Sequence, residues 1–313
     1  MCRVIRITSF ICFAFLFSCS EEHAPVLGGT FETMGTSVYV LPKGAVAVVE
    51  EVFNRVDCEM SEWKNESALS KVNRAAGRSP LECSKELTAV VAFSLEIAER
   101  TDGAFDPTWA CMGEFWDFKN PKVPSEQEVQ GRMHLVNWEN VEVTQNTVYL
   151  KDKGMKIGLG GIAKGVALDK ARDTLLSQGM NNFMLQCGGQ VLVQGSERTV
   201  GIRKPDGLPD EIIGKVSIKN QSISTSGNYE RYFEVDDVRY HHIIDPRTGY
   251  PAKGMKSVTV ISDNAALGDA LSTALFVLGT NKGLELVERT EGVEVLFIDS
   301  ENMVHTSSGF YLE

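Results

Sequence analysis

The sequence predicts an α+β fold in which helices pack against mixed and antiparallel sheets. Three observations support this prediction. Segments of alternating apolar residues and segments with helical apolar spacing both occur along the chain. They follow one another in a mixed order, not in a regular strand–helix alternation. The 313 residues show no internal repeat and no low-complexity linker, and they are enough for one large domain or two smaller ones.

Residues 1–18 are expected to be a lipoprotein signal peptide that lies outside the fold. Arg3 and Arg6 precede an apolar run that ends just before Cys19, which is the arrangement of a secretory leader. The run is too short to span a membrane. Its end, LFSC, resembles a bacterial lipobox, in which the cysteine becomes lipidated. Phe17 is bulkier than the residue usual at its position, and a plain signal peptide cut nearby is the alternative.

Lipid on Cys19 would anchor the mature chain to a membrane. We therefore expect an exported lipoprotein that faces the periplasm, with a short polar tether at 19–29 and a folded domain at 30–313. The sequence does not indicate which of the two membranes would hold the lipid.

In the N-terminal half, apolar alternation predicts a strand within 30–40, and helical spacing predicts a helix over 44–63. A second helix, over 84–107, begins after the N-cap residue Ser84 and ends at glycine and proline stop signals. The chain is then irregular to 135. The other elements expected here are a short helix at 124–133, a hairpin at 140–151 and a strand at 155–159.

In the C-terminal half, a helix is expected at 163–179, followed at 182–195 by two short strands joined at Gly188–Gly189. Helices are also expected at 266–279 and 281–290. The remaining expected strands lie at 215–227, 231–235, 239–245, 256–262 and 293–299.

The stretch GLGGIAKGVALDKA, at 158–171, places four glycines where a helix begins. Glycine permits the turn that must precede a helix. It also lets a phosphate approach the backbone, and the N–H groups at a helix start attract anions. By itself the stretch favours the structural interpretation.

Asp269 and Thr273 are four residues apart on a predicted helix, so both side chains lie on one face. Carboxylate and hydroxyl oxygens are ligands that suit Mg²⁺. The alternative is an acidic residue favoured by the helix dipole and a threonine bonded to its own backbone. The pair alone favours this alternative.

Two adjacent histidines, His241 and His242, precede the turn sequence DPRTG. Neighbouring residues of a strand face opposite sides. One ring would therefore face a pocket and carry a proton near neutral pH. The other interpretation is a surface histidine beside a core histidine.

Phe105, Asp106 and Trp109 lie close together where a helix ends, as a grip on a flat heterocycle or as a helix end packed on the core. The polar turn at 224–231 would line a cleft or cap a sheet edge. Outside the leader, the cysteines have no CxxC spacing, which argues against zinc. Export permits disulfides, but their pairing stays open, and free thiols are equally compatible with the sequence. These cysteines are Cys58, Cys83, Cys111 and Cys187.

The net charge of −11 would become −13 in the mature chain, because residues 1–18 contain two arginines and no acidic residue. With no basic run, this charge argues against a nucleic-acid partner. An acidic protein that binds a polyphosphate usually needs a cation between them.

Taken together and in order, seven motifs resemble the ApbE family of FAD:protein FMN transferases. They are ETMGT, AFDPT, GLGGIAKGVALD, CGGQ, ISTSG, HHIIDPRTG and DALSTALFVLG. The resemblance extends from about Phe31 to the final strand. It implies an ApbE-like, T-fold-like architecture. Whether 30–313 is one unit or two subdomains with the FAD site between them stays open.

The resemblance implies that the chain binds FAD with Mg²⁺, cleaves the diphosphate and moves FMN onto a threonine of an acceptor protein as a phosphoester, releasing AMP. Implied acceptors are flavin-carrying subunits of membrane redox complexes of the RNF or sodium-pumping quinone-reductase type. Two alternatives are an FAD pyrophosphatase that yields FMN and AMP, and a flavin-binding lipoprotein without catalysis.

The same resemblance assigns roles to residues. The glycine-rich main chain and the helix N–H groups from 164 onward would contact the diphosphate. The metal ligands would be the carbonyl of Ala163 and the side chains of Asp269 and Thr273, with Asp269 essential to catalysis. His242 would transfer a proton or steady phosphate charge. Gln190 departs from the acid or asparagine common after GG. The expected nucleotide contacts are Met34, Trp63, Ala104, Phe105, Asp106, Gly160, Lys164, Val166 and Ile243.

Overall fold

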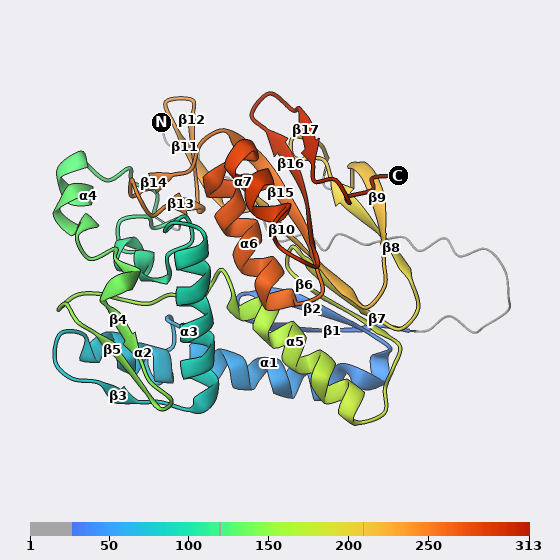
Figure 1. Cartoon of the computed structure of the whole chain (residues 1–313), viewed down its shortest axis with the longest axis horizontal. Helices are drawn as coiled ribbons and strands as arrows, with labels where there is room; N and C mark the ends of the chain where they lie inside the picture. Colours follow the sequence, from blue (N-terminus) through green and yellow to red (C-terminus); the bar gives the residue numbers. More distant parts are fainter. Residues whose placement is uncertain (1–26, 119, 209) are drawn as a thin grey trace, which may run out of the picture.

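The computed structural model describes residues 27–118, 120–208 and 210–313, and its largest element is an eight-stranded sheet (Figure 1). Every neighbouring pair in this sheet is antiparallel. In spatial order the strands are β1 (Gly29–Thr33), β2 (Thr36–Leu41), β6 (Phe183–Cys187), β7 (Gln190–Gln194), β10 (Gln221–Gly227), β15 (Met255–Ser262), β16 (Val293–Asp299) and β17 (Val304–Thr306).

Helices cover one face of this sheet (Figure 1). In the first of them, buried residues recur at helical spacing, from Val49 to Met60. The helix that lies directly on the sheet is buried almost all round, because other helices cover its outer side. This layer consists of α1 (Val46–Met60), α5 (Ala163–Ser177), α6 (Ala265–Leu278) and α7 (Thr280–Val287).

The opposite face is covered by the hairpin of β8 (Arg198–Arg203) and β9 (Ile212–Ile218). Strand alternation divides the side chains between the two faces. In β7, for example, Val193 joins the core under this hairpin, whereas Leu192 joins the core under the helices. The predicted α+β class is therefore confirmed, with an apolar core on each side of one antiparallel sheet.

A second group of elements packs beside the helix layer, and α3 of this group contacts α6 (Figure 1). The group contains α2 (Ala68–Ala75), α3 (Lys85–Arg100), α4 (Glu126–Met133) and a small sheet of β3 (Leu81–Glu82), β5 (Thr147–Leu150) and β4 (Val141–Val143). Two small hairpins lead from β10 to β15: β11 (Tyr232–Val235) with β12 (Val238–His241), and β13 (Ile244–Asp245) with β14 (Tyr250–Pro251). The 3-10 turns are η1 (Lys43–Ala45), η2 (Pro107–Met112) and η3 (Trp138–Asn140).

Three predicted strands are wrong in part. The segment 30–40 is a hairpin, because Met34 and Gly35 have φ of 49° and 71° and form a two-residue turn. The segment 215–227 contains two strands, which meet at Asn220, where φ is 55°. The segment 239–245 is interrupted between β12 and β13.

The segment 155–159, predicted as a strand, is not one. Instead the side-chain amide of Asn73 donates to the carbonyl of Ile157 at 2.9 Å and accepts from its N–H at 2.8 Å. The hairpins at 140–151 and 182–195 are confirmed, and the helix at 163–179 corresponds to α5. Five of the helices and strands were not predicted: α2, β3, β8, β14 and β17.

The expected leader, tether and lipid site lie wholly or mostly outside the described residues, and the division into domains stays a prediction. Within the described part of the chain, every helix is too short or too polar to cross a bilayer. The four cysteines that follow the leader are free thiols, of which Cys111 and Cys187 are buried.

Candidate active site

One end of the large sheet collects several turns. A Cβ added to Gly188, in the β6–β7 turn, would stand 3.5 Å from Oγ1 of Thr36 at the start of β2. The N–H of Thr225, near the end of β10, donates to the carbonyl of Gly189 at 3.0 Å. The turns after β1 and β6 and the end of β10 therefore lie side by side, although they are far apart in the sequence.

The first turn of α5 crosses the first turns of α6, which lies on β10. At the crossing, a Cβ on Gly165 would overlap the carbonyl of Ala265, so only glycine fits. The buried carboxylate of Asp169 accepts the N–H groups of Ala265 and Ala266 at 3.0 and 2.9 Å. Because Asp169 satisfies two free amides of α6, it fixes the start of α6 beside α5.

This crossing brings Asp269 to the glycine-rich turn. Its side chain is buried, and Oδ2 accepts the N–H of Gly165 at 3.1 Å. The ammonium of Lys164 lies 3.7 Å from the same oxygen and donates to the carbonyl of Gly160 at 3.0 Å. A carboxylate and a cation thus stand together at the turn that the resemblance assigns to a diphosphate.

Thr273 also lies at this turn, and we call Phe105, Lys164, Asp269 and Thr273 the group around Asp269. A Cβ on Gly161 would lie 3.5 Å from its Oγ1 and 3.2 Å from the ring of Phe105. Oγ of Ser226, on β10, is also 3.5 Å from Oγ1 of Thr273. The structure therefore brings the predicted residues Phe105, Asp269 and Thr273 together around the turn.

The oxygen atoms of this group fit a magnesium ion better than a transition metal. The carbonyl of Ala163 and the side chains of Asp269 and Thr273 are hard donors. Across residues 27–118, 120–208 and 210–313, no cluster of three or more His, Cys, Asp or Glu side chains forms a ready metal site. With a single carboxylate, an ion here would need further oxygen ligands from a bound substrate.

The four glycines have different roles. Gly165 serves the helix crossing, and a Cβ on Gly158 would overlap the carboxyl of Glu62. Only Gly160 faces open space, with nothing within 4 Å of an added Cβ. The expectation that helix N–H groups from 164 onward meet the anion is wrong for two of them. The N–H of Gly165 donates to Asp269, and that of Val166 donates to Ile162 at 3.0 Å.

Gly165→Ala and Gly160→Ala are expected to separate packing from ligand binding. The first should lower the free energy of unfolding by about 1–3 kcal/mol, because its methyl group overlaps α6. The second should leave stability unchanged and weaken FAD binding at least threefold. Thermal unfolding and FAD titration measure both; equal loss of stability in the two variants would contradict these roles.

The two histidines are held in opposite tautomers. Nε2 of the buried His241 lies 2.9 Å from the carbonyl of Ala252, and Nδ1 accepts the N–H of Ile243. Both nitrogens of His241 are therefore used. Nδ1 of the half-buried His242 lies 3.3 Å from the carbonyl of Arg231. Since a carbonyl only accepts, Nδ1 carries the proton and Nε2 of His242 keeps its lone pair.

Both histidines are neutral at physiological pH. Burial lowers the pKa of His242 to about 3, assisted by the guanidinium of Arg231, and burial lowers the pKa of His241 to about 4. A neutral His242 accepts a proton and does not supply positive charge. Of the two roles expected for it, this favours proton transfer. Nη2 of Arg231 would lie 3.8 Å from a Cβ on Gly35. Arg231 and His242, which contacts its carbonyl, therefore lie near the β1–β2 turn.

The other expected nucleotide contacts lie in different parts of the structure. Met34 and Val166 belong to the same core as Phe105, and so does Ala163, which was expected as a metal ligand. Ala104 and Ile243 belong to the core beneath α6. The carboxylate of Asp106 already accepts three hydrogen bonds, two from Thr108 and one from the N–H of Trp138. Trp63 is 82% exposed on the loop after α1. Nucleotide contact by each stays a prediction.

The sequence patterns did not point to Glu62, the neighbour of Trp63, as a residue of this site. Its carboxyl packs against Gly158, its buried Oε2 has no hydrogen-bond partner, and burial raises its pKa to about 7. An acidic residue between two helices reads as a solvated side chain. Only the contact between this loop and the glycine-rich turn reveals its burial.

Glu62→Gln is expected to change the pH dependence of stability. Between pH 4.5 and about 7 the folded chain holds a proton on Glu62 that the unfolded chain releases, so this carboxyl makes stability fall as pH rises through that window. The variant should therefore gain on the order of 3 kcal/mol relative to wild type between pH 4 and pH 8. Urea unfolding at both pH values measures it, with Glu66→Gln, exposed in the same loop, as control. A constant difference would refute the raised pKa.

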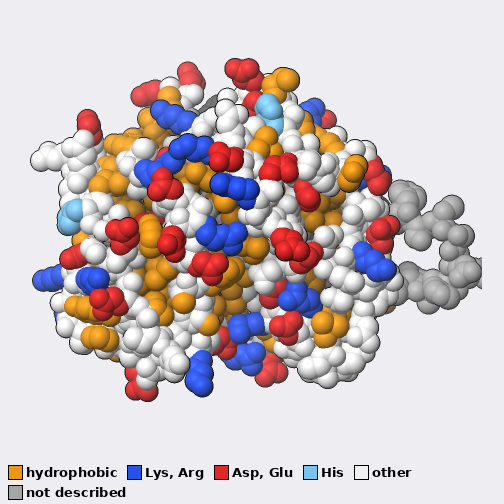
Figure 2. All heavy atoms as spheres, viewed as in Figure 1, with side chains coloured by type: hydrophobic (Ala, Val, Ile, Leu, Met, Phe, Trp, Pro, Cys, Tyr) orange, Lys and Arg blue, Asp and Glu red, His pale blue; other side chains and the backbone are white. Residues whose placement is uncertain are grey.

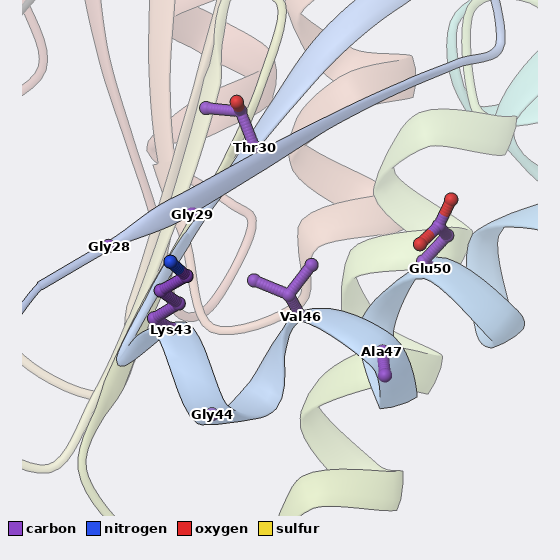
Figure 3. A pocket seen from close by; sticks show the side chains of 8 residues that line it. All are labelled: Gly28, Gly29, Thr30, Lys43, Gly44, Val46, Ala47 and Glu50. Carbon is purple, nitrogen blue, oxygen red and sulfur yellow. The ribbon is translucent and has the colours of Figure 1, made fainter.

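The two surface hollows contain none of the predicted site residues. Acidic and basic side chains are interleaved on the face seen in Figure 2. An open hollow of about 510 Å³ lies where β1 meets the start of α1 (Figure 3). It is lined by Gly28, Lys43 and Glu50 among others, and it contains none of the residues of the group around Asp269. A second hollow lies on α4. The buried group around Asp269 is therefore the better candidate for the active site.

The chain matches the model of the ApbE family over residues 34–297. It is 34% identical to FAD:protein FMN transferases of Klebsiella pneumoniae and Treponema pallidum, over 83% and 84% of this chain and 84% and 80% of theirs. Its fold is similar to that of the ApbE protein of Thermotoga maritima, with a TM-score of 0.84 and 34% identity over 90% of this chain and 97% of that one. The flavin transferase ApbE of Vibrio cholerae gives a TM-score of 0.80 at 27% identity, over 91% and 97%. The chain therefore belongs to the ApbE family.

Proposed function

We propose that this chain is an FAD:protein FMN transferase that moves FMN to a threonine of an acceptor protein and releases AMP. Family membership and the name shared by its curated relatives support the transferase activity. The observation that carries the proposal is the position of Asp269, which contacts Gly165 and Lys164 at the open glycine turn and lies one helical turn from Thr273.

The residues of the chain suit this transfer. The threonine oxygen of the acceptor attacks the phosphorus on the FMN side, a new P–O bond forms, and the bond from that phosphorus to the bridging oxygen breaks, so that AMP leaves. Nε2 of His242 accepts the proton of the attacking hydroxyl. Lys164 and the main chain at Gly160 orient the diphosphate. A magnesium ion held by Ala163, Asp269 and Thr273 would supply positive charge beside the phosphates.

The location and the acceptor belong to the same proposal. Arg3, Arg6, the apolar run and the LFSC ending support export and lipidation at Cys19. An exported, membrane-anchored transferase would meet acceptors on the periplasmic side. The family resemblance favours flavin-carrying subunits of RNF or sodium-pumping quinone-reductase complexes.

The test is incubation of the full chain with FAD, Mg²⁺ and such a subunit, followed by intact mass measurement. We expect the acceptor to gain one FMN, and chelation of the metal to prevent the gain. FMN and AMP formed at the same rate without acceptor would indicate a pyrophosphatase. FAD that stays bound and intact would indicate a carrier. An unmodified acceptor would overturn the proposal.

A further inference from the structure

Two buried polar side chains beside the candidate site lack hydrogen bonds. Gln190, the first residue of β7, is 2% exposed, and neither Oε1 nor Nε2 has a partner. Ser224, on β10, is 1% exposed, and its Oγ has no partner. The two residues are directly opposite in the β7–β10 register. Unmet hydrogen bonds in the interior are costly, so such groups usually hold a ligand or water.

These side chains point toward the helices. Leu192, two residues after Gln190, belongs to the core under the helices, and Ile223, the neighbour of Ser224, belongs to the opposite core. Because side chains alternate along a strand, Gln190 and Ser224 both face the helix layer, where β7 contacts α5 and β10 contacts α6. A Cβ on Gly268 would lie 3.2 Å from Oγ of Ser224. The pair therefore lies under the helical turn that carries Asp269.

Two further contacts place the pair below the oxygen donors. Ser226 follows Ser224 on the same face of β10, and its Oγ is 3.5 Å from Oγ1 of Thr273. On the other side of Gln190, across the β6–β7 register, lies the buried Cys187. Burial raises the pKa of Cys187 to about 12, and the charges of Lys164 and Asp269 both act on it. Cys187, Gln190 and Ser224 thus form a row across three neighbouring strands. The charges of Lys164 and Asp269 act on the Cys187 end of this row.

We propose that Gln190 and Ser224 are positioning residues for the divalent cation at Asp269 and Thr273, and that they hydrogen-bond the water that hydrates it. The inference rests on the metal site of the proposed function. An amide and a hydroxyl accept from such water without adding charge beside Asp269. A site with one carboxylate leaves coordination positions to water, and water needs acceptors in an interior that otherwise offers few.

The test measures binding of Mn²⁺ alone to the full chain by electron paramagnetic resonance, without FAD. Gln190→Leu keeps the approximate size and removes both polar atoms, so we expect it to weaken binding at least threefold. Gln190→Glu places a carboxylate in the same row and should strengthen binding at least threefold. Gln178→Glu makes the same charge change at the exposed C-terminal end of α5, about 22 Å along the helix, and should have no effect.

A change below threefold in Gln190→Leu would overturn the inference and indicate a structural water only. If thermal unfolding shows that Gln190→Leu does not fold, Ser224→Ala takes its place. A change below threefold in Mn²⁺ binding by Ser224→Ala would then overturn the inference. Failure of the proposed function gives a different result: wild type would then bind no Mn²⁺, or Asp269→Asn would bind it as tightly as wild type.

Discussion

Asp269→Asn is expected to reduce FMN transfer at least about 10³-fold. Asparagine keeps the size of the side chain and an oxygen that can accept the N–H of Gly165. It removes the one carboxylate of the proposed magnesium site and the charge that faces Lys164. Loss of metal-based charge stabilisation costs several kcal/mol, and each 1.4 kcal/mol is a factor of ten in rate. Single-turnover transfer, read by mass of the acceptor, measures the effect.

A matched control for this variant is Asp173→Asn, on the exposed side of α5. It removes the same charge away from the turn and should keep wild-type activity. Circular dichroism and thermal unfolding would show that both variants fold. Transfer by Asp269→Asn at a tenth of the wild-type rate or more would contradict the assigned role of the carboxylate.

His242→Gln is expected to lower the rate of transfer 10²- to 10⁴-fold while FAD affinity changes little. This range is typical of a lost general base. Glutamine can still donate to the carbonyl of Arg231 but has no nitrogen lone pair in place of Nε2. His134→Gln, at an exposed position, is the control. Equal losses in kcat and in FAD affinity would indicate a binding role instead.

The pH profile gives an independent test of the same residue. Because the pKa of His242 is about 3, its ring is already neutral at pH 5. The wild-type rate should therefore show no decline around pH 6.5 from protonation of this histidine. The sign for stability is the opposite of that for Glu62. The unfolded chain binds more protons than the folded one between about pH 3 and 6.5, so this histidine makes stability rise with pH there. A rate that halves near pH 6.5 would contradict the lowered pKa.

Much of the fold follows from local patterns. The apolar spacing of α1 and the alternation in β6 and β7 depend on which side chains of one segment share a face. That relation is set by 3.6- and 2-residue periods. The four-residue spacing of Asp269 and Thr273 predicted their common face in the same way. The N-cap at Ser84, whose Oγ accepts the N–H of Leu87, is another local effect.

Turns within a continuing pattern were harder to predict. In 30–40 the two-residue turn at Met34–Gly35 interrupts alternation without changing composition, so the segment read as one strand. The interruption after His241 was missed for a similar reason: the apolar and aromatic residues continue on both sides. Strand alternation therefore could not predict which histidine keeps a free nitrogen, because the hydrogen bonds of the two rings decide it.

The amino-acid sequence alone determined the fold class, the main helices and the group of motifs that identified the family, because these depend on short-range spacing and residue chemistry. The tertiary structure alone decided what Gly165, Glu62 and Gln190 contact. Gly165 meets a carbonyl about one hundred residues later, and Gln190 faces Ser224 across a strand pair. Such contacts arise from sheet register and helix crossing, which bring distant segments together and leave no periodic signal in either one.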